Sequence, residues 1–176
     1  MSSNRTTTLS PQDVVIVIQH LASGAVHTIG GYAEDSNINI EMNADKTYNK
    51  HVSVDNVHSR IYNSDTSASV TVSLAQTSAS NDFLSWLYKY DVASRSVAGL
   101  FTLLIRDGSG RSFYFSDEAW ISDLPDSQFG NGMNNRDWMF DTSRMDTLLG
   151  GNGKISPEDV AAIESLGGTV PAEWRA

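Results

Sequence analysis

The segment Ser67–Leu74, SASVTVSL, constrains the fold most, because its apolar and polar residues alternate with a period of two. Three apolar side chains share one face of the expected strand, and small hydroxyl residues share the other. Residues 66–80 contain no charged residue, so the strand lacks the charges that usually protect a sheet edge. We therefore expect an open edge that pairs with another subunit. The candidate contact residues on this strand are Ser69, Thr71 and Ser73.

A polar hinge follows this strand, and its serine and asparagine side chains are typical of a helix N-terminus. Apolar residues then recur at helical spacing, which predicts a helix over about 81–92 with its apolar stripe on the sheet. The expected packing residues are Phe83, Leu84 and Leu87. The hinge adds Gln76, Asn81 and Asp82 to the candidate assembly residues.

Short apolar runs joined by tight turns occupy most of the remaining chain. They favour a mainly β fold, an antiparallel sandwich or small barrel with one flanking helix. Ser156 and Pro157 predict a short C-terminal helix over about 157–166. Residues 43–51 are polar and are expected to form a loop. The expected organisation is a flexible N-terminal arm over 1–10, a β domain over 11–150 and a C-terminal extension over 151–176.

The composition of the 176-residue chain narrows the possible functions. A net charge of -9 argues against a surface that grips nucleic acid, although DNA could slide past such a surface. The chain has no cysteine, which excludes disulfides and thiolate metal sites. It shows no signal peptide and no apolar run of about 18 residues, so we expect a soluble protein that folds in a cytoplasm.

The residues that could carry chemistry form no convincing constellation. The four histidines lack metal-binding spacing, and residues 148–159 resemble a calcium loop but lack its first ligands. No nucleophile, phosphate-binding or dinucleotide motif occurs, so we expect no enzyme, no cofactor and no metal. The histidines considered are His20, His27, His51 and His58.

The four tryptophans test for a stacking platform. Trp86, Trp120 and Trp138 lie within helix or strand patterns and are expected in the core. Trp174 lies in the tail, where it either docks on a neighbouring subunit or is disordered.

Four stretches, in order, resemble the tail tube proteins of contractile-tailed bacteriophages: SLAQTSASNDFLSWLYKYD, LFTLLIRDGSGRS, EAWISDLPDSQFG and NRDWMFDT. The resemblance covers about residues 11–151, and the hinge over 76–82 is its most specific part. The region after Gly151 has no evident counterpart in the family and is expected to decorate the tube, touch the sheath or bridge rings.

The resemblance implies a structural virion protein, made in the bacterial host cytoplasm, whose six-subunit rings stack into a hollow tube inside a contractile sheath. Its implied partners are further copies of itself, the sheath, baseplate, terminator and tape measure proteins, and DNA that passes without specific binding. Loops such as 43–51 often bridge rings in proteins of this kind. An acidic lumen would repel phosphates. The lumen candidates are Glu34, Asp35, Asp65, Asp123 and Asp126.

Two alternatives remain open. One is a tail terminator or an injection-system tube with the same fold, which would differ in its ability to polymerise alone. The other is a ligand- or carbohydrate-binding β-sandwich, in which exposed aromatic side chains would form the platform.

Overall fold

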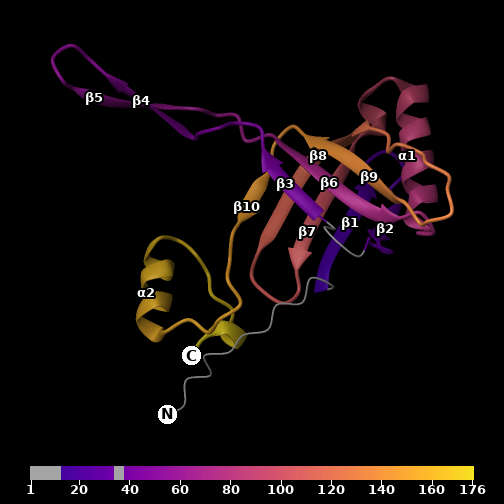
Figure 1. Cartoon of the computed structure of the whole chain (residues 1–176). Coiled ribbons are helices and arrows are strands. Elements are labelled where there is room, and N and C mark those ends of the chain that lie inside the picture. Colours follow the sequence, from indigo (N-terminus) through magenta and orange to yellow (C-terminus); the bar gives the residue numbers. More distant parts are fainter. Residues whose placement is uncertain (1–12, 34–37) are drawn as a thin grey trace.

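The structure is a computed structural model that describes residues 13–33 and 38–176. It confirms a mainly β protein with antiparallel strand pairs and two α-helices (Figure 1). The large sheet contains β1 (Val14–His20), β2 (Val26–Ile29), β3 (Ile38–Met42), β6 (Ala68–Ala75), β7 (Phe101–Asp107), β8 (Phe113–Asp123), β9 (Asn135–Thr142) and β10 (Asp146–Leu148). A separate hairpin contains β4 (Tyr48–Val52) and β5 (His58–Tyr62). The helices are α1 (Ser80–Ser94) and α2 (Pro157–Ser165), with single 3₁₀ turns at Val97–Gly99 and Ala172–Trp174.

The large sheet curls around a single core but does not close into a barrel among the described strands. Its order is β2-β1-β7-β8-β9-β6-β3, with β10 beside the first part of β8. The two end strands have only four and five residues, and the chain after β2 reaches β6 through a single bridge between Tyr32 and Leu74. The expected antiparallel, mainly β fold with a flanking helix is therefore confirmed, but the described strands form a curled, open sheet and not a closed barrel.

The core lies on the concave side of this sheet and under α1. Every second residue of β6 is buried, as the period of two predicts. Trp138 and Phe140 enter from β9, and the Phe140 ring meets Phe101 of β7 edge-on with 5.8 Å between ring centroids. Helix α1 contributes Leu84 and Leu87, which are both buried in the same cluster.

The hinge between β6 and α1 is held by hydrogen bonds to distant parts of the chain. Asn81 donates its amide to the carbonyls of Ala75 and Ser78, and its Oδ1 accepts the indole N–H of Trp138 at 2.9 Å. Ser78 donates to the carbonyl of Gly30 at 2.6 Å. Gly31 has φ +73° and lies so close to Ser78 that a Cβ there would be 2.7 Å from the serine side chain. The hydrogen bonds of Asn81 and Ser78 and the close approach of Gly31 thus fix the turn through which the chain leaves the sheet.

Four strands differ from the sequence-based expectation. The sequence suggests two strands, over 111–115 and 118–121, but residues 113–123 form one long strand, β8, with register shifts where it pairs with its neighbours. The short strands β2 and β10 were not expected. Part of the expected loop over 43–51 is strand β4, which pairs with β5 from Tyr48↔Tyr62 to Val52↔His58.

The C-terminal segment packs against the turn between β7 and β8. Ser156 caps α2 by accepting the backbone N–H of Asp159, and Pro157 occupies the first turn, as expected. Arg111 donates to the carbonyl of Gly153 at 2.7 Å and lies 4.8 Å from the ring centroid of Trp174. Trp174 therefore docks within its own subunit. Across 13–33 and 38–176, no helix is long and apolar enough to span a membrane.

Candidate assembly surface

Strand β6 is an interior strand, and the expectation of an open edge there is wrong. It pairs with β9 along its full length and with β3 on its other side. Its backbone groups are used within the subunit and are not available to a neighbour. The uncharged sequence over 66–80 reflects this central position, since interior strands need no charges to protect them. A contact role for Ser69, Thr71 and Ser73 thus rests on their side chains and stays a prediction.

The outward face of β3, β6, β9 and the end of β8 is acidic, and we call it the acidic sheet face. The strand registers place Ser69 opposite Asp141 and Ser73 opposite Asp137, and the hydroxyl of each serine donates to the facing carboxylate at 2.7 Å and 2.6 Å. Thr71 lies between them, opposite Met139. The ladder places no lysine or arginine on this face. Its carboxylates are Glu41, Asp123, Asp137 and Asp141.

Two of the five predicted lumen carboxylates lie together at one end of this face. Asp123 and Asp126 line a hollow of about 230 Å³, which we call the acidic hollow. Its lining residues are Thr71, Asp123, Leu124, Pro125, Asp126, Asn135, Asp137 and Met139. Asp65 lies elsewhere, beside Ser67, and the backbone hydrogen bond from Ser67 lowers the pKa of its carboxyl group. Glu34 and Asp35 lie outside the described residues.

The hinge and helix residues separate into buried and surface groups. Asn81 is buried and holds the hinge to Trp138, whereas Asp82 is exposed and Gln76 is half-buried. Phe83 is half-buried and stacks on His27 with 4.4 Å between ring centroids. The partial burial of His27 lowers the pKa of its imidazole, and the ring also hydrogen-bonds to the hydroxyl of Ser80 at 2.9 Å.

Three tryptophans were predicted to lie in the core, and the structure differs from that prediction for one of them. Trp138 is buried and Trp120 is half-buried, but Trp86 is 69% exposed on the outer side of α1. Trp86 is beside Lys89, whose ammonium lies 4.7 Å from the indole centroid. The apolar stripe on α1 is narrow, because Leu84 and Leu87 are the apolar side chains of the helix that are buried.

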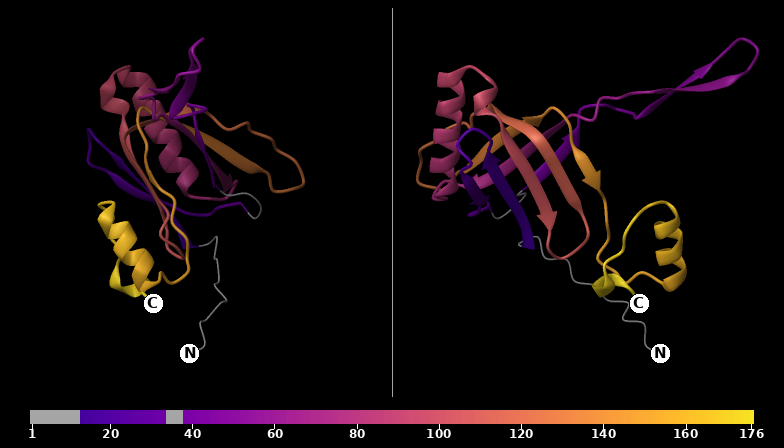
Figure 2. Two further views of the ribbon diagram at one scale, coloured as in Figure 1. Left: turned by 90° about the vertical axis from the view of Figure 1, so that its left-hand side faces the viewer. Right: turned by 180° about the vertical axis from the view of Figure 1, so that it is seen from behind.

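Residues 43–66, which we call the arm, project away from the body (Figures 1 and 2). Every residue of β4 and β5 is exposed. The sequence carries a signal for this hairpin that was missed: Asp55-Asn56 separates two alternating runs, and Asn56 adopts φ +59° in the turn. Such an exposed ribbon is marginally stable without a further layer.

One face of the arm combines aromatic and cationic side chains, and we call it the cationic face. Lys50 and Arg60 are directly opposite each other, and Arg60 lies 4.6 Å from the ring centroid of Tyr48. Tyr48 in turn faces Tyr62. The register places no carboxylate among these residues. The full set is Tyr48, Lys50, Val52, His58, Arg60 and Tyr62.

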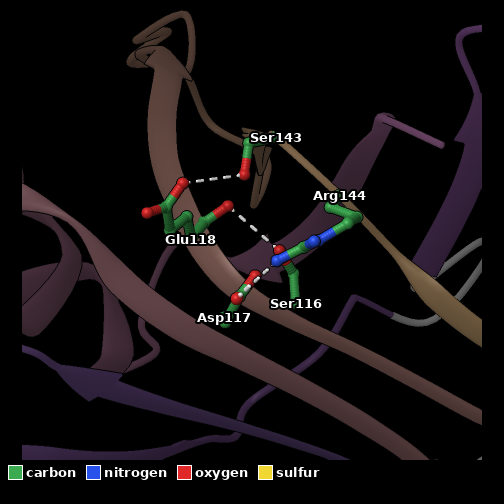
Figure 3. Close-up of polar contacts among 5 residues, drawn as sticks. All are labelled: Ser116, Asp117, Glu118, Ser143 and Arg144. Carbon is green, nitrogen blue, oxygen red and sulfur yellow. Dashed lines mark hydrogen bonds and ion pairs between the residues drawn. The ribbon is translucent and has the colours of Figure 1, made fainter. Parts of the chain in front are cut away.

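Near the base of the arm two acidic side chains of β8 have partners from residues 143 and 144, as Figure 3 shows. Arg144 donates to Asp117 at 3.0 Å, and Ser143 donates to Glu118 at 3.0 Å. These residues adjoin a second hollow, of about 350 Å³, that Thr66 at the end of the arm also lines. The two ends of the sheet thus differ: near the arm the carboxylate of Asp117 has a cationic partner, whereas no ion pair among the described residues involves a carboxylate of the acidic hollow.

The histidines considered in the sequence do not come together in the described ranges. His51 and His58 lie on neighbouring strands of the arm, and no group of three or more histidine or acidic residues is placed to hold a metal ion there.

Comparison with known proteins gives the family. The family model for the bacteriophage PhiTE tail tube protein matches residues 6–150. The chain is also 44% identical over 172 residues to the structural protein ORF10 of Pseudomonas phage KPP10, covering 98% of this chain and 99% of that protein. The family model ends at residue 150, whereas the alignment with this relative includes most residues after 151, so the C-terminal segment has a counterpart in that protein.

Two solved structures share the fold at only 8% sequence identity. The cap that terminates the tube of the anti-feeding prophage gives a TM-score of 0.50, with 84% of this chain and 95% of the cap covered. The sheath/tube terminator of the extracellular contractile injection system PVC also gives 0.50, with 82% and 99% covered. The likeness extends to the fold alone. The family match covers most of the chain, and the protein therefore belongs to the bacteriophage PhiTE tail tube family, as a non-enzymatic structural protein of the phage tail.

Proposed function

We propose that subunits of this protein join into closed, six-membered rings that stack into the hollow tail tube, through which DNA leaves the virion inside a contractile sheath. The acidic sheet face carries this proposal. A wall with four carboxylates per subunit and no lysine or arginine on the same face of its strand ladder repels phosphates, so DNA passes without adhering. In this arrangement Asp123, Asp137 and Asp141 face the lumen.

The edges of the sheet supply the contacts within a ring. Among the described strands, β2 and β3 end the sheet, and each has one side without a partner. Pairing β3 of one subunit with β2 of the next would continue the sheet around the ring, and such a heterologous contact closes when the rotation allows it. The arm projects beyond the body and extends to an adjacent ring. The remaining partners we propose are the sheath, baseplate, terminator and tape measure proteins.

Negative-stain electron microscopy of the purified, concentrated protein tests the proposal. Hollow tubes of uniform diameter are the expected result. Rings that never stack would favour the terminator alternative, and protein that stays monomeric at all concentrations would overturn assembly by this chain. A fluorescent DNA duplex is expected to show no binding to the tubes at low salt, where any electrostatic attraction would be strongest.

A further inference from the structure

The chain contains the tripeptide Gly-Asn-Gly twice, at residues 130–132 and 151–153. An asparagine followed by glycine is prone to lose its side-chain amide, because the backbone nitrogen of the glycine can attack the side-chain carbonyl carbon. Glycine has no Cβ, so it adopts the backbone conformation that this attack requires at little steric cost. The local sequence is the same at both sites, and a difference in reactivity between them must therefore come from the fold.

The first site, Asn131 and Gly132, lies in the long connection between β8 and β9 (Figure 2). Asn134 donates its side-chain amide to the carbonyl of Gln128 at 3.1 Å and closes the neck of this connection. Residues 129–133 form the tip, and all of them are exposed and lie outside helices and strands. Within the described ranges, Asn131 and Gly132 make no hydrogen bond, and a Cβ on Gly132 would have no neighbour within 4 Å. The backbone of the tip is therefore free to rearrange.

The second site, Asn152 and Gly153, is held by contacts with other parts of the subunit. Both residues are half-buried, and the guanidinium of Arg111 donates to the carbonyl of Gly153 at 2.7 Å. Two residues later, the backbone N–H of Ile155 donates to the carbonyl of Trp174 at 2.8 Å. The charged hydrogen bond from Arg111 must be broken before this segment can rearrange, which raises the barrier to attack on Asn152.

We propose that Asn131 is a site of spontaneous modification, converted in the folded protein to aspartate or isoaspartate, and that the fold protects Asn152 from the same reaction. The backbone nitrogen of Gly132 gives its proton to water and forms a bond to Cγ of Asn131. The bond from Cγ to Nδ2 breaks, and the nitrogen leaves as ammonia after taking a proton from water. A second water molecule then opens the cyclic imide at either of its carbonyl carbons. The net reaction converts an amide and water into a carboxylate and an ammonium ion, so it needs neither an oxidant nor a cofactor.

The reaction adds a negative charge near the acidic hollow. Leu124 and Asp126, which line the hollow, belong to the same connection as Asn131. Isoaspartate also lengthens the backbone by a methylene group, and the tip has room for it, since a Cβ on Gly130 or Gly132 would have no neighbour within 4 Å. A modified subunit therefore keeps its fold and becomes more acidic beside a face that already repels phosphates.

Peptide mapping by mass spectrometry tests the inference. The wild-type protein is incubated at mildly alkaline pH in water enriched in heavy oxygen, so that the isotope marks every amide lost during the incubation. In the folded protein, loss at Asn131 is expected to be at least about 10-fold faster than loss at Asn152. In urea the two sites should react at similar rates, because the tripeptide is the same. Equal rates in the folded protein, or a difference that persists in urea, would overturn the inference.

Two variants separate the causes, and far-UV circular dichroism checks that both are folded. Gly132→Val places a branched side chain beside the attacking nitrogen and should slow the loss at Asn131 without changing Asn152. Arg111→Ala releases the carbonyl of Gly153 and should accelerate the loss at Asn152 without changing Asn131. An unchanged rate at the targeted asparagine in Gly132→Val would contradict the chemistry, and in Arg111→Ala it would contradict the protection. These rates do not depend on tube formation, so a failure to assemble overturns only the proposed function.

Discussion

Strand β6 and the arm are both built from alternating sequence, yet their surroundings are opposite. Alternate residues of β6 are fully buried, and strands pair with it on both sides. The strands of the arm pair only with each other, and all their residues are exposed. Alternation alone thus predicts a strand without predicting whether that strand builds the core or projects from it.

The difference lies in the side chains that share one face of each alternating strand. In β6 that face is aliphatic throughout, with Val70, Val72 and Leu74, and it can be covered by a helix. In the arm the corresponding face mixes tyrosines with Lys50 and Arg60. Burying unpaired cations under a helix would cost on the order of several kcal/mol, so this face stays exposed in the isolated subunit. Four predictions test this contrast, in order of decreasing effect on stability.

Replacing Trp138 with alanine should lower the free energy of unfolding by about 3–5 kcal/mol, because a fully buried indole is lost and Asn81 loses its donor. Urea denaturation followed by circular dichroism measures the change. Trp86→Ala is the control and should change stability by less than about 0.5 kcal/mol, since that indole is mostly exposed. Similar losses in both variants would contradict the division into core and surface.

Replacing Asn81 with alanine should cost about 1–3 kcal/mol, because the buried indole N–H and two carbonyls lose their partner. The same urea titration applies. Asp82→Ala, at the exposed neighbouring position in the first turn of α1, should cost less than about 1 kcal/mol. If the two cost the same, the hinge is not held by the asparagine.

Stability should also fall slightly on mild acidification because of His27. Folding lowers the pKa of this imidazole below its ordinary value of 6.5, so the unfolded chain takes up a proton first as the pH decreases. The contribution is therefore complete above about pH 6.5 and is lost as the pH falls through that value toward the folded-state pKa. His27→Gln should show a shallower decrease in the free energy of unfolding between pH 7.5 and 5.5 than the wild type, and an equally steep decrease would contradict this cause.

Removing the arm should leave the body's stability unchanged. Thr47 and Asn63 are joined by a backbone hydrogen bond of 2.8 Å, so residues 48–62 can be replaced by an Asn-Gly turn. The free energy of unfolding should change by no more than about 0.5 kcal/mol. Electron microscopy of the same variant should show that its rings no longer stack into tubes. A large loss of stability would mean that the arm contributes to the core.

The sequence predicted the elements whose burial follows from local pattern. The helix over 81–92, the C-terminal helix after Ser156 and the strand over 67–74 all follow from periodicity and capping, and the structure confirms each within two residues. The core position of Trp138 followed from its strand pattern as well.

The remaining features depended on long-range pairing, which a local pattern does not contain. The neighbours of β6 are set by β3 and β9, strands distant in sequence, and so its edge was wrongly expected to be open. Asp137 and Asp141 were not selected, because only the register places them opposite Ser73 and Ser69. Trp86 was assigned to the core because helical spacing does not give the width of the buried stripe.

The projection of the arm from one end of the sheet has a consequence for the length of an assembly (Figure 1). If each copy reaches the next ring through its arm, adding a ring always leaves a new set of arms free. Nothing in such a subunit limits the number of rings. The length of a filament built this way must be set by another molecule, and its growth must be stopped by a component that binds the last arms and offers none of its own.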